Sequence, residues 1–311
     1  MHSFTRAFRF AATLLALPAV ALAAQQPAPT TPLSPAAELV RQGRRLVGEG
    51  KYDDALTLYT KAIAIAPDLS NAHLAAGVAL DLKGDYSAAR VHIQRAIETA
   101  APDVRNDALR TMALSYAFER NAGEAIRYEK QVYDAELAKL EFDAAAGIAN
   151  ELGRICLESG DYDNATIWYG KGFETAGKQL ALTDTAKDLW AFRWHNAQAR
   201  IAARRGKGAE ALKHAHEARE ALESGRNPEQ NQYIPYLTGY VAFYTGDVNT
   251  AIADLQKADQ RDPFILSLLA QAYEKKGDQA TALEYWKKVL TFNGHNPPNA
   301  FARPLARKRV G

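Results

Sequence analysis

Cysteine is nearly absent from this sequence, and residues that favour β-strands are scattered. The single cysteine, Cys156, excludes an intramolecular disulfide and a zinc site built from several thiolates. The chain of 311 residues is 47% hydrophobic and 24% charged, so it is expected to fold. Because helix-forming residues dominate, the composition excludes an all-β protein and predicts that Cys156 lies in a helical core.

The chain also lacks an excess of charge of one sign. It contains 38 Lys and Arg against 36 Asp and Glu, and two of the cations, Arg6 and Arg9, lie in an N-terminal segment without acids. The remaining chain is therefore neutral. Because nucleic-acid binding depends on many contacts of Lys and Arg with phosphates, we expect no nucleic acid as a partner.

Residues 1–23 have the organisation of a secretion signal. Two arginines precede an apolar stretch, which ends in small side chains at Ala21 and Ala23. We expect cleavage near Ala23, with Ala24 as the alternative, and an exported protein that is periplasmic or secreted. An uncleaved anchor is the other interpretation, although the apolar stretch is short for a bilayer and Pro18 interrupts it.

Long apolar segments are missing from the rest of the chain. Residues 24–35 contain four prolines and are predicted to form an extended linker. No segment after this linker is long and apolar enough to cross a bilayer, so we expect no integral membrane span in the mature chain.

One pattern recurs through the remaining sequence. A glycine is followed five residues later by an alanine, and this layout is clearest at Gly50, Gly84, Gly160, Gly246 and Gly277. Weaker copies end in Ala125 and Ala211. Apolar and small residues recur at helical spacing before and after each glycine, which can end one helix by adopting a left-handed conformation. The pattern predicts seven helical hairpins.

The residues of the first hairpin resemble the consensus of the tetratricopeptide repeat family. The matching positions are Leu39, Gly43, Leu46, Gly50, Tyr52, Ala55, Tyr59, Ala62 and Pro67. The resemblance covers about residues 36–294 and implies an all-α, right-handed superhelical solenoid of about seven antiparallel helix-turn-helix repeats. With the secretion signal, the chain is similar to exported bacterial members of this family. Repeats three to five resemble the elongated repeats of kinesin light chains, and their second helices are expected to be long.

The resemblance also implies a concave groove that binds a protein or peptide. In the family, defined positions of each first helix line this groove, and here they are occupied by Asn150, Arg154, Asn196 and Arg200, with Arg110 and Arg193 adding charge nearby. Asn can bond a peptide backbone and Arg can bind a carboxylate with two parallel bonds, so we predict an acidic or C-terminal segment as the partner. The alternative is a solvated face, or ion pairs with Glu151 and Glu158.

An aromatic strip follows in the sixth repeat. Its members are Tyr236, Tyr240, Phe243 and Tyr244, which are spaced three and four residues apart on a helix expected to begin near Ile234. Such residues are favoured at interfaces, so they are candidates for the same groove. Some must instead pack in the core between repeats six and seven, and the sequence leaves open how many reach the groove.

Signals for catalysis, cofactors or metals are weak. The glycines at 206 and 208 imitate part of a dinucleotide loop, but no strand precedes them, so we interpret them as a turn. His195, His214 and His216 do not form a known metal-binding motif, and His214 and His216 face different sides of a helix. We therefore predict a non-catalytic scaffold without cofactor or metal. The alternatives are a metal-dependent enzyme with a site in the elongated middle repeats around His195 and His214, and a self-associating structural oligomer.

Residues 295–311 form a basic tail with two possible roles. Its four cations, which could contact an anionic membrane surface or an acidic partner weakly, are Arg303, Arg307, Lys308 and Arg309. The favoured role is that of a capping helix, which Asn299 would begin and whose Phe301 and Leu305 would cover the last repeat.

Overall fold

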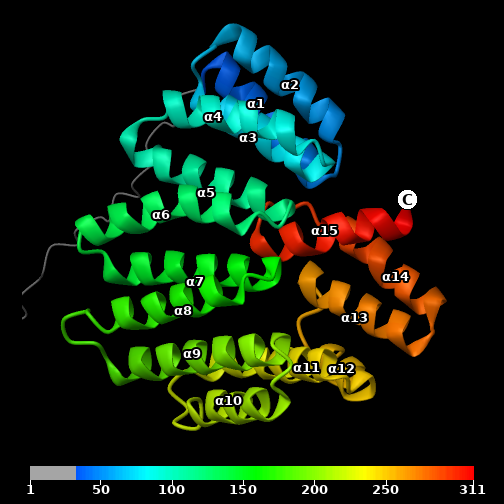
Figure 1. Ribbon diagram of the computed structural model, residues 1–311. Helices are drawn as coiled ribbons and strands as arrows, with labels where there is room; N and C mark the ends of the chain where they lie inside the picture. Colours follow the sequence, from blue (N-terminus) through cyan, green and yellow to red (C-terminus); the bar gives the residue numbers. More distant parts are fainter. Residues whose placement is uncertain (1–32) are drawn as a thin grey trace, which may run out of the picture. The chain divides into compact units, whose positions relative to one another are not determined.

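A computed structural model describes residues 33–311 of the chain, so the predicted signal peptide and nearly all of the predicted linker lie outside the described residues. The described part contains fifteen α-helices and one 3-10 helix, η1, and no β-strand (Figure 1). The first helices of the seven pairs are α1 (Pro35–Gly48), α3 (Ser70–Lys83), α5 (Pro102–Phe118), α7 (Phe142–Ser159), α9 (Asp184–Arg204), α11 (Ile234–Thr245) and α13 (Pro263–Lys276). The second helices are α2 (Tyr52–Ile65), α4 (Tyr86–Thr99), α6 (Ala122–Ala138), α8 (Tyr162–Ala176), α10 (Gly208–Glu220), α12 (Val248–Leu255) and α14 (Gln279–Leu290), while η1 (Pro228–Tyr233) precedes α11 and α15 (Pro297–Val310) ends the chain.

Each helix packs against the next, which confirms the predicted stack of seven helical hairpins. The middle repeats are elongated as expected, but the position of the extra length differs from the prediction. In repeat five the first helix, α9, has 21 residues, whereas the second helix, α10, has only 13. The expectation of a long second helix is therefore wrong for this repeat.

The turns inside the hairpins show why the glycine pattern predicts helix ends. Gly84 and Gly160 adopt left-handed conformations with φ of 95° and 94°, which residues with a Cβ adopt only at a steric cost. The next helix then begins with an aspartate cap: the Asp161 side chain, for example, accepts a hydrogen bond from the backbone N–H of Asn164 at 3.1 Å. Helix α11 begins at Ile234, with Pro235 in its first turn, as predicted.

Small residues allow the two helices of a hairpin to approach closely. A Cβ at Gly153 in α7 would lie 2.7 Å from the ring of Tyr169 in α8, so only glycine leaves room for this ring. Cys156 is fully buried in the same repeat, as predicted, and burial raises the pKa of its thiol to about 12. This thiol therefore stays protonated and packs as a small apolar group.

The last helix, α15, packs against the last repeat and against two helices from the middle of the stack. It contacts α13 and α14 of the last repeat, as expected for a capping helix, but it also contacts α5 and α7 (Figure 1). Arg303 of α15 donates hydrogen bonds to the backbone oxygen of Leu82 at 2.8 Å and to those of Leu290 at 3.2 Å and Phe292 at 2.8 Å. One buried side chain thus joins the ends of a helix in repeat two and a helix in repeat seven.

The four cations of the basic tail differ in burial and in their partners. Arg303 is buried, so the prediction that it could contact a membrane surface is wrong. Arg307 donates to the backbone oxygen of Leu82 at 2.5 Å, Arg309 pairs with Glu274 at 2.8 Å, and Lys308 is exposed. No helix within residues 33–311 has both the length and the apolar character that a bilayer span needs.

The start of α15 differs from the prediction in one detail. Asn296, and not Asn299, caps the helix, because its side chain accepts a hydrogen bond from the backbone N–H of Asn299 at 3.0 Å. Asn299 is buried and donates to the backbone oxygens of Phe292 and Gly294 at 3.1 and 2.8 Å. Phe301 is buried, as expected for a residue that covers a repeat.

Candidate functional site

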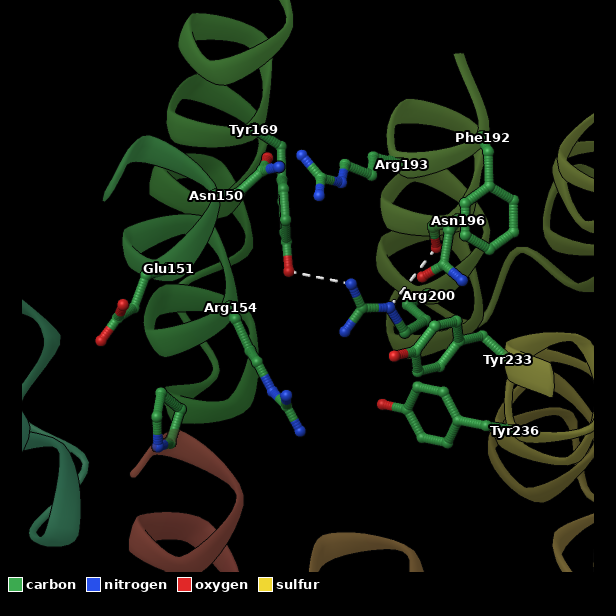
Figure 2. A pocket seen from close by; sticks show the side chains of 11 residues that line it. Asn150, Glu151, Arg154, Tyr169, Phe192, Arg193, Asn196, Arg200, Tyr233 and Tyr236 are labelled. Atoms are coloured by element: carbon green, nitrogen blue, oxygen red, sulfur yellow. Dashed lines mark hydrogen bonds between the residues drawn. The ribbon is translucent and has the colours of Figure 1, made fainter. Parts of the chain in front are cut away.

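A cavity of about 360 Å³ lies among α7, α8, α9 and α11, and its volume is in the range typical of ligand pockets (Figure 2). Six of the ten residues predicted for the groove line it together: Asn150, Arg154, Arg193, Asn196, Arg200 and Tyr236. The other lining residues are Glu151, Tyr169, Phe192, Tyr233 and Pro297. Because Pro297 begins α15, the start of the C-terminal helix forms part of the cavity wall.

The cavity contains more positive than negative charge. Three arginines, Arg154, Arg193 and Arg200, line it together with a single carboxylate, Glu151. That carboxylate is already engaged, because its Oε2 lies 2.5 Å from Nη2 of Arg110. Within the described part of the chain, none of the three arginines lies within 4.0 Å of a carboxylate oxygen.

The sequence left open whether Glu151 and Glu158 form ion pairs with the predicted groove residues. In the structure both glutamates pair with arginines outside the cavity. Glu151 pairs with Arg110, and Glu158 pairs with Arg204, its Oε2 lying 2.8 Å from the arginine Nη1. Neither glutamate pairs with Arg154 or Arg200, so the guanidinium groups of the cavity form no ion pair with the acidic side chains that the structure describes.

Aromatic rings hold these guanidinium groups in place. The guanidinium carbon of Arg200 lies 5.6 Å from the ring centre of Tyr169, and its Nη2 donates to the Tyr169 hydroxyl at 2.9 Å. Arg193 lies over Trp190 at 4.7 Å and Arg154 over a phenylalanine ring at 5.5 Å. Rings position cations but carry no full negative charge, so the site remains attractive to an anion.

Two buried polar atoms at the cavity have no partner among the described residues. They are Nε of Arg154 and the hydroxyl oxygen of Tyr236. Burial raises the pKa of Tyr236 to about 12, so this hydroxyl remains a hydrogen-bond donor near neutral pH. Figure 2 shows Arg154, Arg193, Arg200 and Tyr236 pointing into one shared space. Buried donors without acceptors are costly, and an anionic ligand would supply the acceptors.

Arg110 lies outside this cavity. It lines a neighbouring cavity of about 320 Å³, which shares Glu151 and Pro297 with the first. Its guanidinium is committed to Glu151 and lies 3.9 Å from a carboxylate oxygen of Glu129. Burial, together with repulsion from Glu151, raises the pKa of Glu129 well above its usual range. Arg110 therefore balances buried acids and does not add free charge to the site.

The aromatic strip is divided between the cavity and the core. Tyr236 lines the cavity, whereas Tyr240 and Phe243 are only 0% and 3% exposed, so the prediction that these two line the groove is wrong. Tyr244 is half-buried, and its ring lies 4.7 Å from the guanidinium carbon of Arg204. Tyr240 packs against Phe264 of α13, with ring centres 6.5 Å apart, so the next repeat covers this part of the strip, which spacing along one helix could not show.

Sequence reasoning missed several residues of the cavity. Tyr169 belongs to a second helix and Tyr233 to η1, so neither occupies the first-helix positions from which the groove was inferred. Phe192 belongs to α9 but precedes the Asn and Arg pair of that helix. Phe192 could have been found from the sequence, because it is an aromatic residue directly before the predicted groove residue Arg193.

Two of the three candidate histidines, the two named in the metal-site alternative, lie close together in the structure. His195 and His214 lie together, with Nδ1 atoms 3.4 Å apart, and both contact Glu217, which the sequence analysis did not single out. His216 is exposed and faces away from this cluster, as its helical position predicts.

Comparisons with known proteins agree with the repeat architecture. Family models described as tetratricopeptide repeat match residues 46–112 and 265–296, so the chain contains repeats of this type. Superkiller complex protein 3 of Mus musculus is similar at 26% identity over 284 residues, which cover 88% of this chain and 16% of that protein. This chain thus spans about a sixth (16%) of the length of that relative.

A crystal structure of a tetratricopeptide repeat protein from Parabacteroides merdae ATCC 43184 is similar over most of both chains. The match covers 88% of this chain and 97% of that one, with a TM-score of 0.53 and 13% sequence identity. At this identity the likeness shows the shared fold: a stack of helix-turn-helix repeats.

Proposed function

We propose that this chain is a non-catalytic scaffold that binds an acidic segment of a protein partner in the cavity among α7, α9 and α11. The observation that carries the proposal is the set of three guanidinium groups, none of which lies within 4.0 Å of a carboxylate oxygen of the side chains that the structure describes. Arginine in such a site binds carboxylates through charge-assisted hydrogen bonds, which are stronger than neutral ones. Repeat stacks of this kind are generally protein-interaction scaffolds, which supports a protein as the source of the anion.

The uncharged lining favours a peptide over a small inorganic anion. Asn150 and Asn196 offer amides that can both donate to and accept from a peptide backbone. Phe192 and Tyr233 add apolar surface at the same cavity, which a hydrated inorganic anion would not use. Its volume of about 360 Å³ suits a chain end or a single acidic side chain with its neighbours better than a long peptide lying along a continuous groove.

Peptide binding tests this proposal. Fluorescence anisotropy would compare short labelled peptides that end in consecutive aspartates with the same peptides carrying asparagines, each with a free and an amidated C-terminus. We expect the acidic peptides to bind more tightly and their affinity to fall as salt is raised. Changing Arg154 or Arg193 to glutamine should weaken binding about ten- to a hundredfold, because each removes a charge-assisted hydrogen bond.

The matched control is Arg41→Gln. Arg41 is an exposed arginine of α1 that pairs with Glu38, so this change removes the same charge far from the cavity in sequence and should leave peptide affinity unchanged. Arg200 is not used, because it is buried and bonded to Tyr169, and its loss would disturb the fold. Equal binding of acidic and neutral peptides, or unchanged binding in both cavity variants, would contradict the proposal.

We also propose that the scaffold works outside the cytoplasm, as part of a bacterial cell envelope. The support is the arrangement of residues 1–23, with cations, an apolar stretch and small residues at Ala21 and Ala23. Intact-mass measurement on protein from the envelope fraction of a bacterial host should show a chain that begins at Ala24. A chain that stays in the cytosolic fraction would contradict export, whereas a chain in the envelope fraction that retains residues 1–23 would contradict cleavage and favour the uncleaved anchor.

A further inference from the structure

Two histidine pairs occupy equivalent places in repeats two and five. His73 and His92 flank the turn of repeat two, and His195 and His214 flank that of repeat five, with the members of each pair 19 positions apart in the sequence. The Nδ1 atoms lie 3.2 Å apart in the first pair and 3.4 Å apart in the second. The chain thus contains two versions of one arrangement, and their surroundings decide what each can bind.

The pair in repeat two is satisfied by its own hydrogen bonds. Nε2 of His73 lies 2.9 Å from the backbone oxygen of Pro67, which can only accept, so this nitrogen carries the proton. Nδ1 of His73 is then the acceptor for the N–H of His92. Arg95 lies six residues after Ala89, the alanine of the repeat pattern in repeat two. It is a cation that pairs with Asp68 at 2.5 Å. Nothing here favours a metal ion.

In repeat five, the position that corresponds to Arg95 is occupied by a carboxylate, that of Glu217. Oε2 of Glu217 lies 2.7 Å from Nδ1 of His214 and 3.0 Å from Nδ1 of His195. The three side chains are 20–27% exposed, so the cluster is open to solvent but partly held by packing. Lys213 approaches only the other oxygen of Glu217, at 3.7 Å. Each of the three side chains offers one atom that could bind a metal ion, and these atoms all lie within 4.8 Å of one another. Among the described residues, this is the group of His, Cys, Asp and Glu side chains that meets this condition.

We propose that His195, His214 and Glu217 form a binding site for a divalent transition-metal ion of the Zn²⁺ type. Two imidazoles and one carboxylate are a ligand set that Zn²⁺ accepts, with a fourth position left for water. For bonds of about 2.0–2.1 Å, ligands of a tetrahedral ion lie about 3.3–3.4 Å apart. The observed Nδ1–Nδ1 separation of 3.4 Å matches this edge, and a small rotation of the partly exposed Glu217 side chain would lengthen its shorter distances to the imidazoles.

The ion would join the two helices of repeat five. His195 belongs to α9, whereas His214 and Glu217 lie one turn apart on α10. A ligand that binds only the folded pair of helices stabilises that pair. Because α9 also carries Asn196 and Arg200, the ion would hold the helix that supplies one side of the cavity, although the metal site does not depend on any peptide binding there.

Titration with Zn²⁺ tests the site. Isothermal titration calorimetry on the untagged chain should show one ion bound per chain, and Co²⁺ in its place should give the visible absorption of a tetrahedral site. Changing His214 to alanine or Glu217 to glutamine should lower Zn²⁺ affinity at least about tenfold and abolish the Co²⁺ absorption. The glutamine variant keeps the shape of the side chain, and circular dichroism would establish that both variants remain helical.

The chain offers two matched controls. His92→Ala removes the equivalent histidine of repeat two, and His216→Ala removes an exposed histidine of α10 that lies 3.4 Å from Glu220. Both should bind Zn²⁺ and Co²⁺ as the unchanged chain does. Absence of a bound ion in the unchanged chain, loss of binding in either control, or full binding in the His214 variant would overturn the proposal.

Discussion

Replacing Arg303 with alanine should reduce the hydrogen-exchange protection of α15 by about a hundredfold, equivalent to about 3 kcal/mol. The substitution removes a buried cation that donates to the backbone oxygens of Leu82, Leu290 and Phe292 and to the hydroxyl of Tyr52. Helix C-termini are negative ends of peptide dipoles, so they stabilise this cation where no carboxylate is present. Without it, the carbonyls lose their donors and the contact between repeats two and seven opens.

Lys308→Ala is the control for this prediction. Lys308 is an exposed cation of the same helix, so its loss should change protection by less than about 0.5 kcal/mol. Hydrogen exchange followed by mass spectrometry resolves the effect by segment, which matters because repeats in a stack open locally. Protection of α9 and α10 should stay unchanged. If α15 is equally protected in both variants, Arg303 does not join the two ends.

Replacing Glu158 with glutamine should lower the free energy of unfolding by about 3–5 kcal/mol. Glu158 is 1% exposed, lies 2.8 Å from Arg204 and accepts a hydrogen bond from the hydroxyl of Tyr240 at 3.1 Å. These three residues belong to α7, α9 and α11, the helices that surround the candidate site. Glutamine keeps the size of the side chain but leaves Arg204 as a buried cation without its carboxylate, which is the costly state.

Urea denaturation monitored by circular dichroism would measure this loss, with Glu210→Gln as the control. Glu210 pairs with Lys207 at 3.1 Å on the surface, so its replacement should cost less than about 1 kcal/mol. A similar midpoint for the two variants would mean that Glu158 and Arg204 do not stabilise the stack.

The fold could be predicted because its signals are local. Gly84 and Gly160 mark helix ends through their left-handed conformation, and the alanines after each turn mark the close approach of two helices. A repeated local signal also fixes the neighbours, since each hairpin can bury its apolar face only against the next one. The stack of seven hairpins followed from these residues alone.

The site was predictable only where one helix face carries it. Asn150 and Arg154 lie four residues apart on α7, so their shared face follows from helical geometry. Contacts between distant segments have no such signal. Arg303 reaches Leu82 across 221 residues, and the burial of Tyr240 depends on how α11 packs against later helices, so neither could be inferred from spacing.

The central claim is that Arg154 and Arg193 bind an acidic group of a partner, and NMR of arginine side chains tests it most directly. The Nε–Hε resonances of the ¹⁵N-labelled chain, assigned by single substitutions, would be followed during titration with an aspartate-terminated peptide. Saturable shifts are expected for Arg154 and Arg193 but not for Arg41, which lies on the exposed face of α1. Resonances of Arg154 and Arg193 that stay in place while the peptide binds would contradict the account.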